Sequence, residues 1–241
     1  MLALNQELLS HFETIFIKKQ TIAIDTKIQN LVKYLHLPVL ISAHQGDKYK
    51  NPQIAKQGGN LFRVANKQND EALVKATKLK LMLSTDSTQA NYPKVNITSD
   101  KLSPNFSATY KTGESRATAI AHIKALLEDA DSIDIVDKYL SSIDSRTTYD
   151  VWNRKNLNIL KSILPQKAIT LNICCDNDWN NSREQDLSNF CSGWNIVKKH
   201  WDTSIHDRYI ITDKVSILIS SGVSNLDDRS SKDLSYIVEI K

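Results

Sequence analysis

The sequence lacks the features that mark membrane-spanning, secreted or zinc-dependent proteins. No apolar run approaches the roughly 20 residues needed to cross a bilayer, and the N-terminus has neither the basic flank nor the long apolar stretch of a signal peptide. Cys174, Cys175 and Cys191 match no zinc-binding spacing, and the adjacent pair ends an apolar run typical of a buried strand. An odd cysteine count fits a reducing compartment. We therefore expect a cytoplasmic protein without a metal site.

Strong net charge, internal repeats and low-complexity tracts are absent as well. The 241 residues include 31 Lys and Arg against 27 Asp and Glu, which gives a formal net charge of +4. This mildly basic balance is compatible with a polyanionic partner but is far below the density of a dedicated nucleic-acid-binding arm. With 41% hydrophobic residues, the chain is long enough for one large domain or for one domain and a smaller appendage.

From residue 113 onward, helices and strands alternate in the pattern of an α/β fold. Apolar residues at helical spacing predict helices over 116–129, 153–164 and 182–190. Apolar runs predict strands over 132–136, 168–175, 194–201, 206–212, 215–219 and 234–240. We therefore predict an α/β domain at 113–241, with a sheet flanked by helices.

Residues 1–112 show a weaker pattern, for which we predict a smaller α+β region of unknown role. The predicted elements are helices at 4–18 and 26–35 and after the capping residues 69–71, strands at 37–41, 79–83, 95–97 and 106–110, and a polar loop at 46–69. The stretch 84–113 is rich in Ser, Thr, Asn and Pro, and we place the domain boundary at its end. The alternative is one continuous domain in which this stretch forms edge strands and long loops.

Two apolar strands joined by a tight turn stand out near the C-terminus. The first begins at His206 and Arg208, the turn is Asp213-Lys214, and a loop of small residues at 220–225 follows the second strand. Because alternate residues of a strand project from the same face, His206 and Arg208 can point at one ligand. An imidazole beside a fixed cation suits a phosphate group.

The ends of the predicted strands bring further polar residues toward this pair. In open α/β sheets, ligands collect beyond the carboxyl ends of the strands, and Asp137 and Tyr139 occupy such a place after the strand 132–136. His206 instead precedes its strand. If that strand runs antiparallel to its neighbours, Asp137, Tyr139, the small-residue loop and His206 meet at one rim of the sheet.

The same stretch resembles the motif of the phospholipase D superfamily, in which His-x-Lys, a later Asp and a Gly-Ser-x-Asn loop form a phosphodiester site. His206 matches the His, Asp213 matches the Asp, and Arg208 stands where Lys is usual. The resemblance implies a phospholipase D-like sheet in this part of the chain. Asp213 has a second interpretation as a plain turn residue, because an Asp-Lys tip between two apolar runs suits a hairpin.

The small-residue loop matches the family motif less closely. Gly222 lies farther from Asp213 than the family's Gly does, and Gly-Val-Ser-Asn places its serine differently. Asn225 and either Ser221 or Ser224 are therefore approximate equivalents of the family's Asn and Ser. The resemblance makes these three residues candidate contacts to a substrate and gives Gly222 a structural role.

The segments Asp137-Lys138-Tyr139 and His206-Asp207-Arg208 also resemble the phospholipase D-like C-terminal domain of MIT-domain proteins, which binds membranes rather than cleaving lipids. Active phospholipase D members bring two motifs together, from two halves of a chain or from two subunits, whereas this chain has one. The resemblance therefore implies either a homodimer that pairs two His206 residues or a domain that keeps the fold without the chemistry.

In the catalytic interpretation, neutral His206 attacks phosphorus, a second His protonates the leaving oxygen, and water then releases the phosphoryl group. Arg208 neutralises the charge on the phosphate, while Asn225 and a loop serine donate hydrogen bonds. No metal or cofactor is required. His200 is an alternative proton donor within the same chain. Trp179, Trp194, Trp201 and Tyr209 fit either base stacking or packing between sheet and helices.

Two functions stay open on the sequence alone. The first is a metal-independent phosphodiesterase, preferably a nuclease, that acts as a homodimer. A pI near 8.8 and the lack of a lipid-binding apolar stretch favour DNA or RNA over phospholipid. The second is a non-catalytic phospholipase D-like module that binds a phosphate-bearing ligand, a membrane or a protein through Arg208, with Asp137 and Tyr139 at the same rim.

Overall fold

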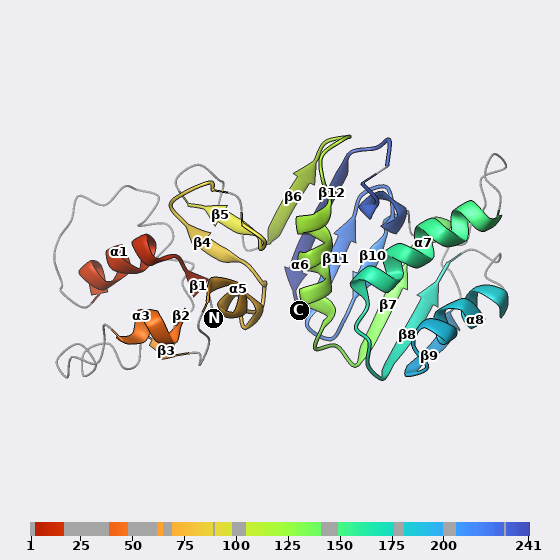
Figure 1. Ribbon diagram of the computed structural model, residues 1–241, viewed down its shortest axis with the longest axis horizontal. Helices are drawn as coiled ribbons and strands as arrows, with labels where there is room; N and C mark the ends of the chain where they lie inside the picture. The colour runs from red at the N-terminus through yellow and green to blue at the C-terminus, as the bar shows by residue number, and fades with distance from the viewer. Residues whose placement is uncertain are drawn as a thin grey trace. The chain divides into compact units, whose positions relative to one another are not determined.

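Two β-sheets organise the described chain, one in each of two units that divide between Pro104 and Asn105 (Figure 1). The computed structural model describes residues 3–16, 39–47, 62–64, 69–88, 90–97, 105–140, 149–175, 181–199, 206–228 and 230–241. Strands alternate with helices in both units, which confirms the α/β class that we predicted for the C-terminal part of the chain. Within the described ranges, no helix combines the length and the apolar character needed to cross a membrane.

The first unit contains a parallel sheet of five short strands in the order β3-β2-β1-β4-β5. Its elements are β1 Ala3–Leu4, α1 Gln6–Phe16, β2 Val39–Ile41, α3 Ala43–Asp47, β3 Phe62–Val64, α5 Asp70–Lys75, β4 Met82–Ser84 and β5 Lys94–Asn96. Every neighbouring pair of strands is parallel. β1 therefore lies in the middle, where the strand order changes direction.

This parallel sheet makes the first unit an α/β structure, whereas the sequence predicted an α+β region. Strands of two or three residues are too short to distinguish the alternating pattern of a half-exposed strand from the continuous apolar run of a buried parallel strand. β3 also lies within 46–69, which composition predicted to be a loop. The predicted helix at 26–35 falls outside the described residues.

Asn69 begins α5 in the way that the sequence predicted. Its side chain accepts a hydrogen bond from the Ala72 N–H at 2.9 Å, which satisfies a donor that the helix start would otherwise leave unpaired. Leu73 and Val74 of this helix are buried in one apolar cluster with Met82, which lies on β4 of the same unit. The cap and the apolar contact together fix the helix on the sheet.

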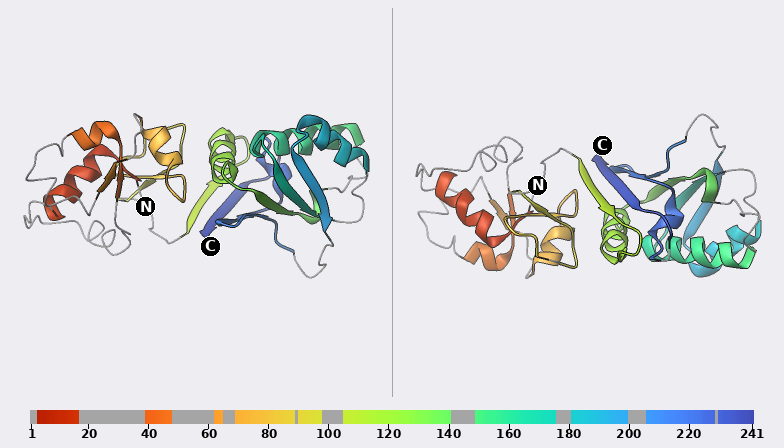
Figure 2. Two further views of the ribbon diagram at one scale, coloured as in Figure 1. Left: turned by 90° about the horizontal axis from the view of Figure 1, so that it is seen from below. Right: turned by 90° about the horizontal axis from the view of Figure 1, so that it is seen from above.

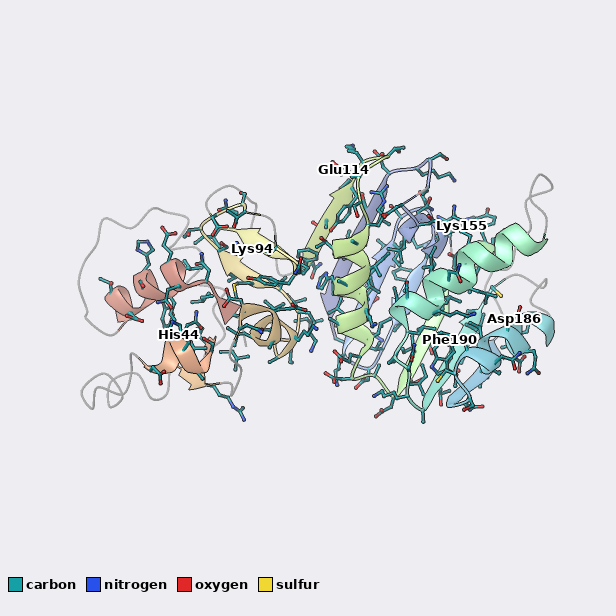
Figure 3. All side chains as sticks on the ribbon, viewed as in Figure 1. His44, Lys94, Glu114, Lys155, Asp186 and Phe190 are labelled. Atoms are coloured by element: carbon teal, nitrogen blue, oxygen red, sulfur yellow. The ribbon has the colours of Figure 1, made fainter. Side chains whose placement is uncertain are left out.

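Polar side chains at the carboxyl ends of β1 and β4 bind one another. Asn5 accepts the Leu8 N–H at 2.9 Å and donates to Ser84 Oγ at 3.1 Å. Asp86 accepts a hydrogen bond from Lys94 Nζ at 2.6 Å, and this bond holds the pKa of the Asp86 carboxyl well below its usual range. Lys94 is labelled among the side chains in Figure 3. This polar edge therefore satisfies its hydrogen bonds from within.

The second unit contains a mixed sheet of seven strands in the order β6-β12-β11-β10-β7-β8-β9. Its elements are β6 Phe106–Tyr110, α6 Ala117–Leu127, β7 Ser132–Val136, α7 Tyr149–Ile163, β8 Ile169–Cys174, α8 Asn181–Phe190, β9 Trp194–Lys199, β10 Tyr209–Ile211, β11 Val215–Ile219 and β12 Leu234–Ile240. β7, β8 and β9 are parallel, and all other neighbours are antiparallel. β10 therefore runs antiparallel to both β7 and β11.

The strand and helix predictions for this unit are confirmed in type and order. β7, β11 and β12 have the predicted bounds, and the turn at Asp213-Lys214 joins β10 to β11. β10 is shorter than the predicted strand at 206–212, because only Tyr209–Ile211 pair with both neighbours. His206 and Arg208 consequently precede the strand instead of lying on it.

The second unit begins at Asn105, ahead of the boundary that we placed at residue 113. β6 is responsible, because it pairs along its whole length with β12, the last strand. Asn105 Nδ2 also donates to Glu239 Oε1 at 3.1 Å across this pair. The first and last strands of the unit are thus neighbours in the sheet.

All three helices of the second unit cover the same face of its sheet, as the views in Figures 1 and 2 agree. Side chains on that face form the core, where Ile135, Ile210 and Ile217 of adjacent strands are fully buried. Tyr209 and Leu218, on the opposite face, are only half-buried. The described residues place no helix over that opposite face.

Candidate functional site

The ends of three neighbouring strands come together at one rim of the second sheet. Asp137 and the short helix η2 Lys138–Leu140 follow β7, and a loop with the short helix η3 Val223–Leu226 follows β11. Arg208 precedes β10, which lies antiparallel between these two strands. The Arg208 carbonyl accepts the Ile219 N–H at 2.9 Å. We predicted that these segments would meet if the strand after His206 ran antiparallel to its neighbours, and β10 does so. We call this region the rim.

Asp137 holds the rim together from within. Its side chain is 3% exposed, and its carboxylate oxygens accept the N–H groups of Val223 at 2.9 Å and Tyr139 at 3.0 Å. Gly222 packs so closely that an added Cβ would lie 2.7 Å from Asp137 Oδ2. The φ of Gly222, +93°, also favours glycine. Asp137 thus fastens the loop after β11 to the end of β7.

Arg208 lies beside this carboxylate with its guanidinium only partly engaged. Nε is 3.9 Å from Asp137 Oδ1, too far for a hydrogen bond, and it is buried without a hydrogen-bond partner among the described residues. The Tyr139 ring centre lies 5.2 Å from Arg208 Cζ, within the range of a cation–π contact. The Arg208 side chain is 24% exposed. Asp137 and Tyr139 therefore orient a cation that solvent still reaches.

The electrostatic environment of Asp137 follows from its burial. Burial raises the pKa of this carboxyl above its usual value, while the N–H groups of Val223 and Tyr139 and the charge of Arg208 act in the opposite direction. Because Asp137 is buried and accepts two backbone hydrogen bonds, its role is to hold the segments of the rim in place. Contact with an anionic ligand is better served by Arg208.

His206 is exposed just ahead of Arg208. Because both residues precede β10, the alternation that placed them on one face of a strand does not apply. Within the described part of the chain, no hydrogen bond or ion pair involves the imidazole. The described fold therefore makes no structural use of this ring. His200, the alternative proton donor, falls outside the described residues.

Asn225 is buried and shapes the loop after β11. Its Nδ2 donates to the carbonyls of Ser221 and Gly222, and its Oδ1 accepts the Ser230 hydroxyl. Ser221 has a φ of +62°, a left-handed conformation that is strained for a residue other than glycine. Ser221 is exposed and Ser224 is half-buried. Asn225 thus affects the site through loop conformation, and Ser221 is the more accessible of the two candidate serines.

Asp213 lies in the turn between β10 and β11, at the opposite end of these strands from Arg208. Thr212 organises that turn, because its Oγ1 accepts the N–H groups of Lys214 at 3.1 Å and Val215 at 3.0 Å. Asp213 itself is exposed. This position agrees with the turn interpretation of Asp213 and separates it from the rim.

Two features of the rim were missed in the sequence. The first is the contact between Gly222 and Asp137, which joins residues far apart in the chain. Its only signal in the sequence is a glycine within a loop of small residues. The second is Lys138, whose Nζ lies 5.8 Å from the Tyr139 ring centre and brings a second cation to the rim. Its position directly after Asp137 is the signal that could have identified it.

Two of the remaining aromatic candidates, Trp194 and Tyr209, lie among the described residues. Trp194 is buried, and its Nε1 donates to the Pro165 carbonyl at 2.9 Å, which supports core packing. Tyr209 is half-buried, and its hydroxyl donates to Asp207 at 3.2 Å. Trp179 and Trp201 fall outside the described residues.

The cysteines and other potential metal ligands do not gather into a site. Cys175 is buried and Cys174 is half-buried, and burial raises the pKa of the Cys174 thiol. Across the described ranges, no group of three or more His, Cys, Asp or Glu side chains is placed to hold a metal ion.

Comparison with known proteins gives limited similarity. No protein-family model and no curated protein sequence matches this chain. TrmBL2, described as an archaeal chromatin protein with a novel mode of DNA binding, aligns over 56% of this chain and 45% of its own, at 10% identity and a TM-score of 0.31. NucT from Helicobacter pylori aligns over 56% of this chain and 86% of its own, at 14% identity and a TM-score of 0.33. Both similarities are too weak to assign a family or a function.

Proposed function

We propose that the rim of the second unit binds the phosphodiester backbone of a nucleic acid through Arg208. The observation that carries this proposal is a partly exposed guanidinium, which Asp137 and Tyr139 orient but no described residue hydrogen-bonds. Arg116 also has donors without a partner, but it is fully buried and out of reach of a ligand. Structural arginines normally have their donors paired. A partly exposed arginine with unpaired donors is suited to an external anion.

The shape of the guanidinium favours phosphate as that anion. Its donors form a planar fork that can contact two oxygens of one phosphate, and stacking on the Tyr139 ring leaves the edge of the fork available. Lys138 adds a second positive charge beside the same ring. The overall pI near 8.8 is compatible with a polyanion. A nucleic acid supplies both the phosphate group and the extended negative charge.

Hydrolysis of that phosphodiester is the second candidate function, and the exposed His206 favours it. The imidazole lies two positions before Arg208, and the described fold does not use it. In this reaction His206 attacks phosphorus and forms a phosphohistidine, while His206 of a second copy gives its proton to the leaving oxygen. Water then cleaves the phosphohistidine. Ser221 or Ser224 would donate to the phosphate, and Asn225 would fix the loop that carries them.

Binding is tested by fluorescence anisotropy of labelled DNA and RNA with the full chain. Arg208→Gln should weaken binding about 10- to 100-fold, the value of a lost charge-assisted contact. The affinity of Arg208→Lys should lie between those of the wild type and Arg208→Gln, because lysine keeps the charge but lacks the planar fork of donors. The matched control is Arg63→Gln, which removes an exposed arginine from the first unit. Equal losses in the two Gln variants, or no binding by the wild type, would overturn the proposal.

Catalysis is tested separately, with the same labelled strands in the presence of EDTA. Cleavage by the wild type that His206→Ala abolishes would establish the second function, and sedimentation would show whether the active species is a dimer. Equal cleavage by both proteins would remove His206 as the nucleophile. Binding without cleavage would leave the rim as a binding module.

A further inference from the structure

Tyr139 is the most exposed large apolar side chain among the described residues, at 54%. Its exposure contrasts with that of Tyr236, which is buried in the same unit and bonds to His122 Nδ1 at 2.8 Å. Tyr236 is part of the core, whereas Tyr139 is more than half exposed. Tyrosine and arginine are among the residue types that are enriched where binding energy concentrates at interfaces.

The Tyr139 backbone is fixed although its ring is exposed. Asp137 accepts the Tyr139 N–H through its side chain at 3.0 Å and the Leu140 N–H through its carbonyl at 3.0 Å. Leu140 is buried, and its own carbonyl accepts a hydrogen bond from Asn156 Nδ2 on α7 at 3.2 Å. The backbone that carries the ring is therefore held in place, which lowers the cost of ordering this residue when a ligand binds.

The position of the ring next to Arg208 indicates what it contacts. A phosphate bound to Arg208 would place the attached nucleotide within reach of a ring whose centre is 5.2 Å from the guanidinium carbon. Aromatic side chains stack on nucleobases, but in a duplex the base faces are covered by neighbouring bases. Only an unpaired strand can offer a base to Tyr139 and a phosphate to Arg208 together.

We infer that Tyr139 stacks against a base of the bound strand and makes the rim selective for single-stranded nucleic acid. This inference rests on the proposed function, because Arg208 must first hold the phosphate. Arg208 supplies attraction to any phosphodiester, and Tyr139 supplies the discrimination between unpaired and paired strands. Asp137 positions both residues through its contacts in the rim.

Three probes of equal length separate these contributions in anisotropy measurements with the full chain. They are a single-stranded DNA, the same sequence as a duplex, and an abasic strand that keeps the phosphates and has no bases. The wild type should prefer the single strand to both others. Tyr139→Ala should weaken single-strand binding about tenfold, within the range for one stacked base, and leave abasic binding unchanged. Tyr139→Trp should restore the preference.

Arg208→Gln serves as the comparison, because it should weaken binding to all three probes. A strand carrying 2-aminopurine adds a direct readout, since its fluorescence should fall on binding to the wild type and not on binding to Tyr139→Ala. Equal wild-type affinity for single strand and duplex would refute the stacking role while leaving the proposed function intact. The same holds if Tyr139→Ala weakens abasic and normal strands equally. Absence of binding to every probe would overturn both the proposed function and the stacking role. The finding that Tyr139 contacts a protein partner and no nucleic acid would do the same.

Discussion

The two units both carry polar side chains at the carboxyl ends of their strands, but they differ in what those side chains bind. In the first unit, Asn5 and Ser84 bind each other, and Lys94 binds Asp86. In the second, each Asp137 carboxylate oxygen accepts a backbone N–H, while the Arg208 guanidinium has no hydrogen-bond partner among the described residues. The comparison teaches that a polar edge alone does not identify a ligand site. An oriented and partly exposed cation with unpaired donors is the more specific sign.

Strand direction accounts for part of this difference. A parallel sheet brings only carboxyl ends of strands to one edge, so the first unit gathers the residues that follow β1 and β4. The mixed sheet brings the start of β10 to the same rim as the ends of β7 and β11. The residues before a strand and after a strand therefore face each other there. This arrangement places Arg208 beside Asp137.

The largest effect should come from removing the Asp137 carboxylate. Asp137→Ala leaves the buried Val223 N–H and the partly buried Tyr139 N–H without their acceptor and should lower the free energy of unfolding of the second unit by about 3 kcal/mol. Urea unfolding followed by tryptophan fluorescence measures this unit alone, because all four tryptophans lie after residue 105. The control is Asp131→Ala, since Asp131 is almost fully exposed. A loss no larger than that of the control would show that Asp137 does not hold the rim.

Substitution of Gly222 should have the next largest effect. Gly222→Ala places a methyl group against Asp137 Oδ2 at a positive φ, and should cost about 2 kcal/mol or more in unfolding free energy. Gly113→Ala is the matched control, because Gly113 has a φ of +87° and no atom within 4 Å of an added Cβ. It should cost about 1 kcal/mol, from the backbone alone. Equal losses would mean that the Asp137 contact adds nothing.

Asn5→Ala tests the paired edge of the first unit. The variant loses the cap on the Leu8 N–H and the bond to Ser84, and should destabilise the first unit by about 1 kcal/mol. Hydrogen exchange in residues 3–16 and 82–97 should increase, while binding of nucleic acid stays unchanged. Arg208→Ala should show the reverse, with weaker binding and unchanged exchange. A loss of binding in Asn5→Ala would break the distinction between the two edges.

The pH dependence of stability should also differ between the units. Burial raises the pKa of Asp137, so its contribution is fully present below the usual carboxyl pKa and is lost as pH rises through the raised value. Asp86 has the opposite sign, and its contribution is lost as pH falls below the usual range. The wild-type second unit should therefore gain stability relative to Asp137→Asn on going from neutral to acidic pH. If unfolding followed by tryptophan fluorescence gives the wild type and Asp137→Asn the same change in stability with pH, this expectation is wrong.

The smallest effect is expected at Asp213. Asp213→Asn alters an exposed turn residue at the far end of β10, so stability should change by less than about 0.5 kcal/mol. Affinity for nucleic acid should stay within twofold of the wild type, roughly the scatter of surface substitutions. A loss in affinity comparable to that of Arg208→Gln would restore an orienting role for Asp213.

Much of the second unit could be predicted from its apolar pattern. Strands such as β7 and β12 are long enough to show the alternation of side chains, and the Asp-Lys turn marks the hairpin. The strands of the first unit are too short for this, and their parallel pairing depends on contacts between distant segments. The α/β class of the second unit was therefore predictable, while the class of the first was not.

The sequence predicted which residues belong to the candidate site better than it predicted how they contact one another. The rule that ligands collect at strand ends brought Asp137, Tyr139 and Arg208 to one rim. The sequence could not show that the Asp137 carboxylate binds the backbone of a distant loop, or that the Asn225 amide is used by its own loop. Both contacts depend on backbone conformation, which residue type alone does not specify.

The pairing of β6 with β12 has a consequence for how the second unit folds. β12 lies between β6 and β11, so β6 has no neighbour in the sheet until residues 234–240 are in place. Pairing between such distant segments is slow, because a long loop must close before the contact forms. During synthesis, β6 and β11 both keep open edges that can pair with other chains. The last strand of the unit therefore covers the open edge of β11 and one edge of β6, and β6 stays as the edge strand of the finished sheet.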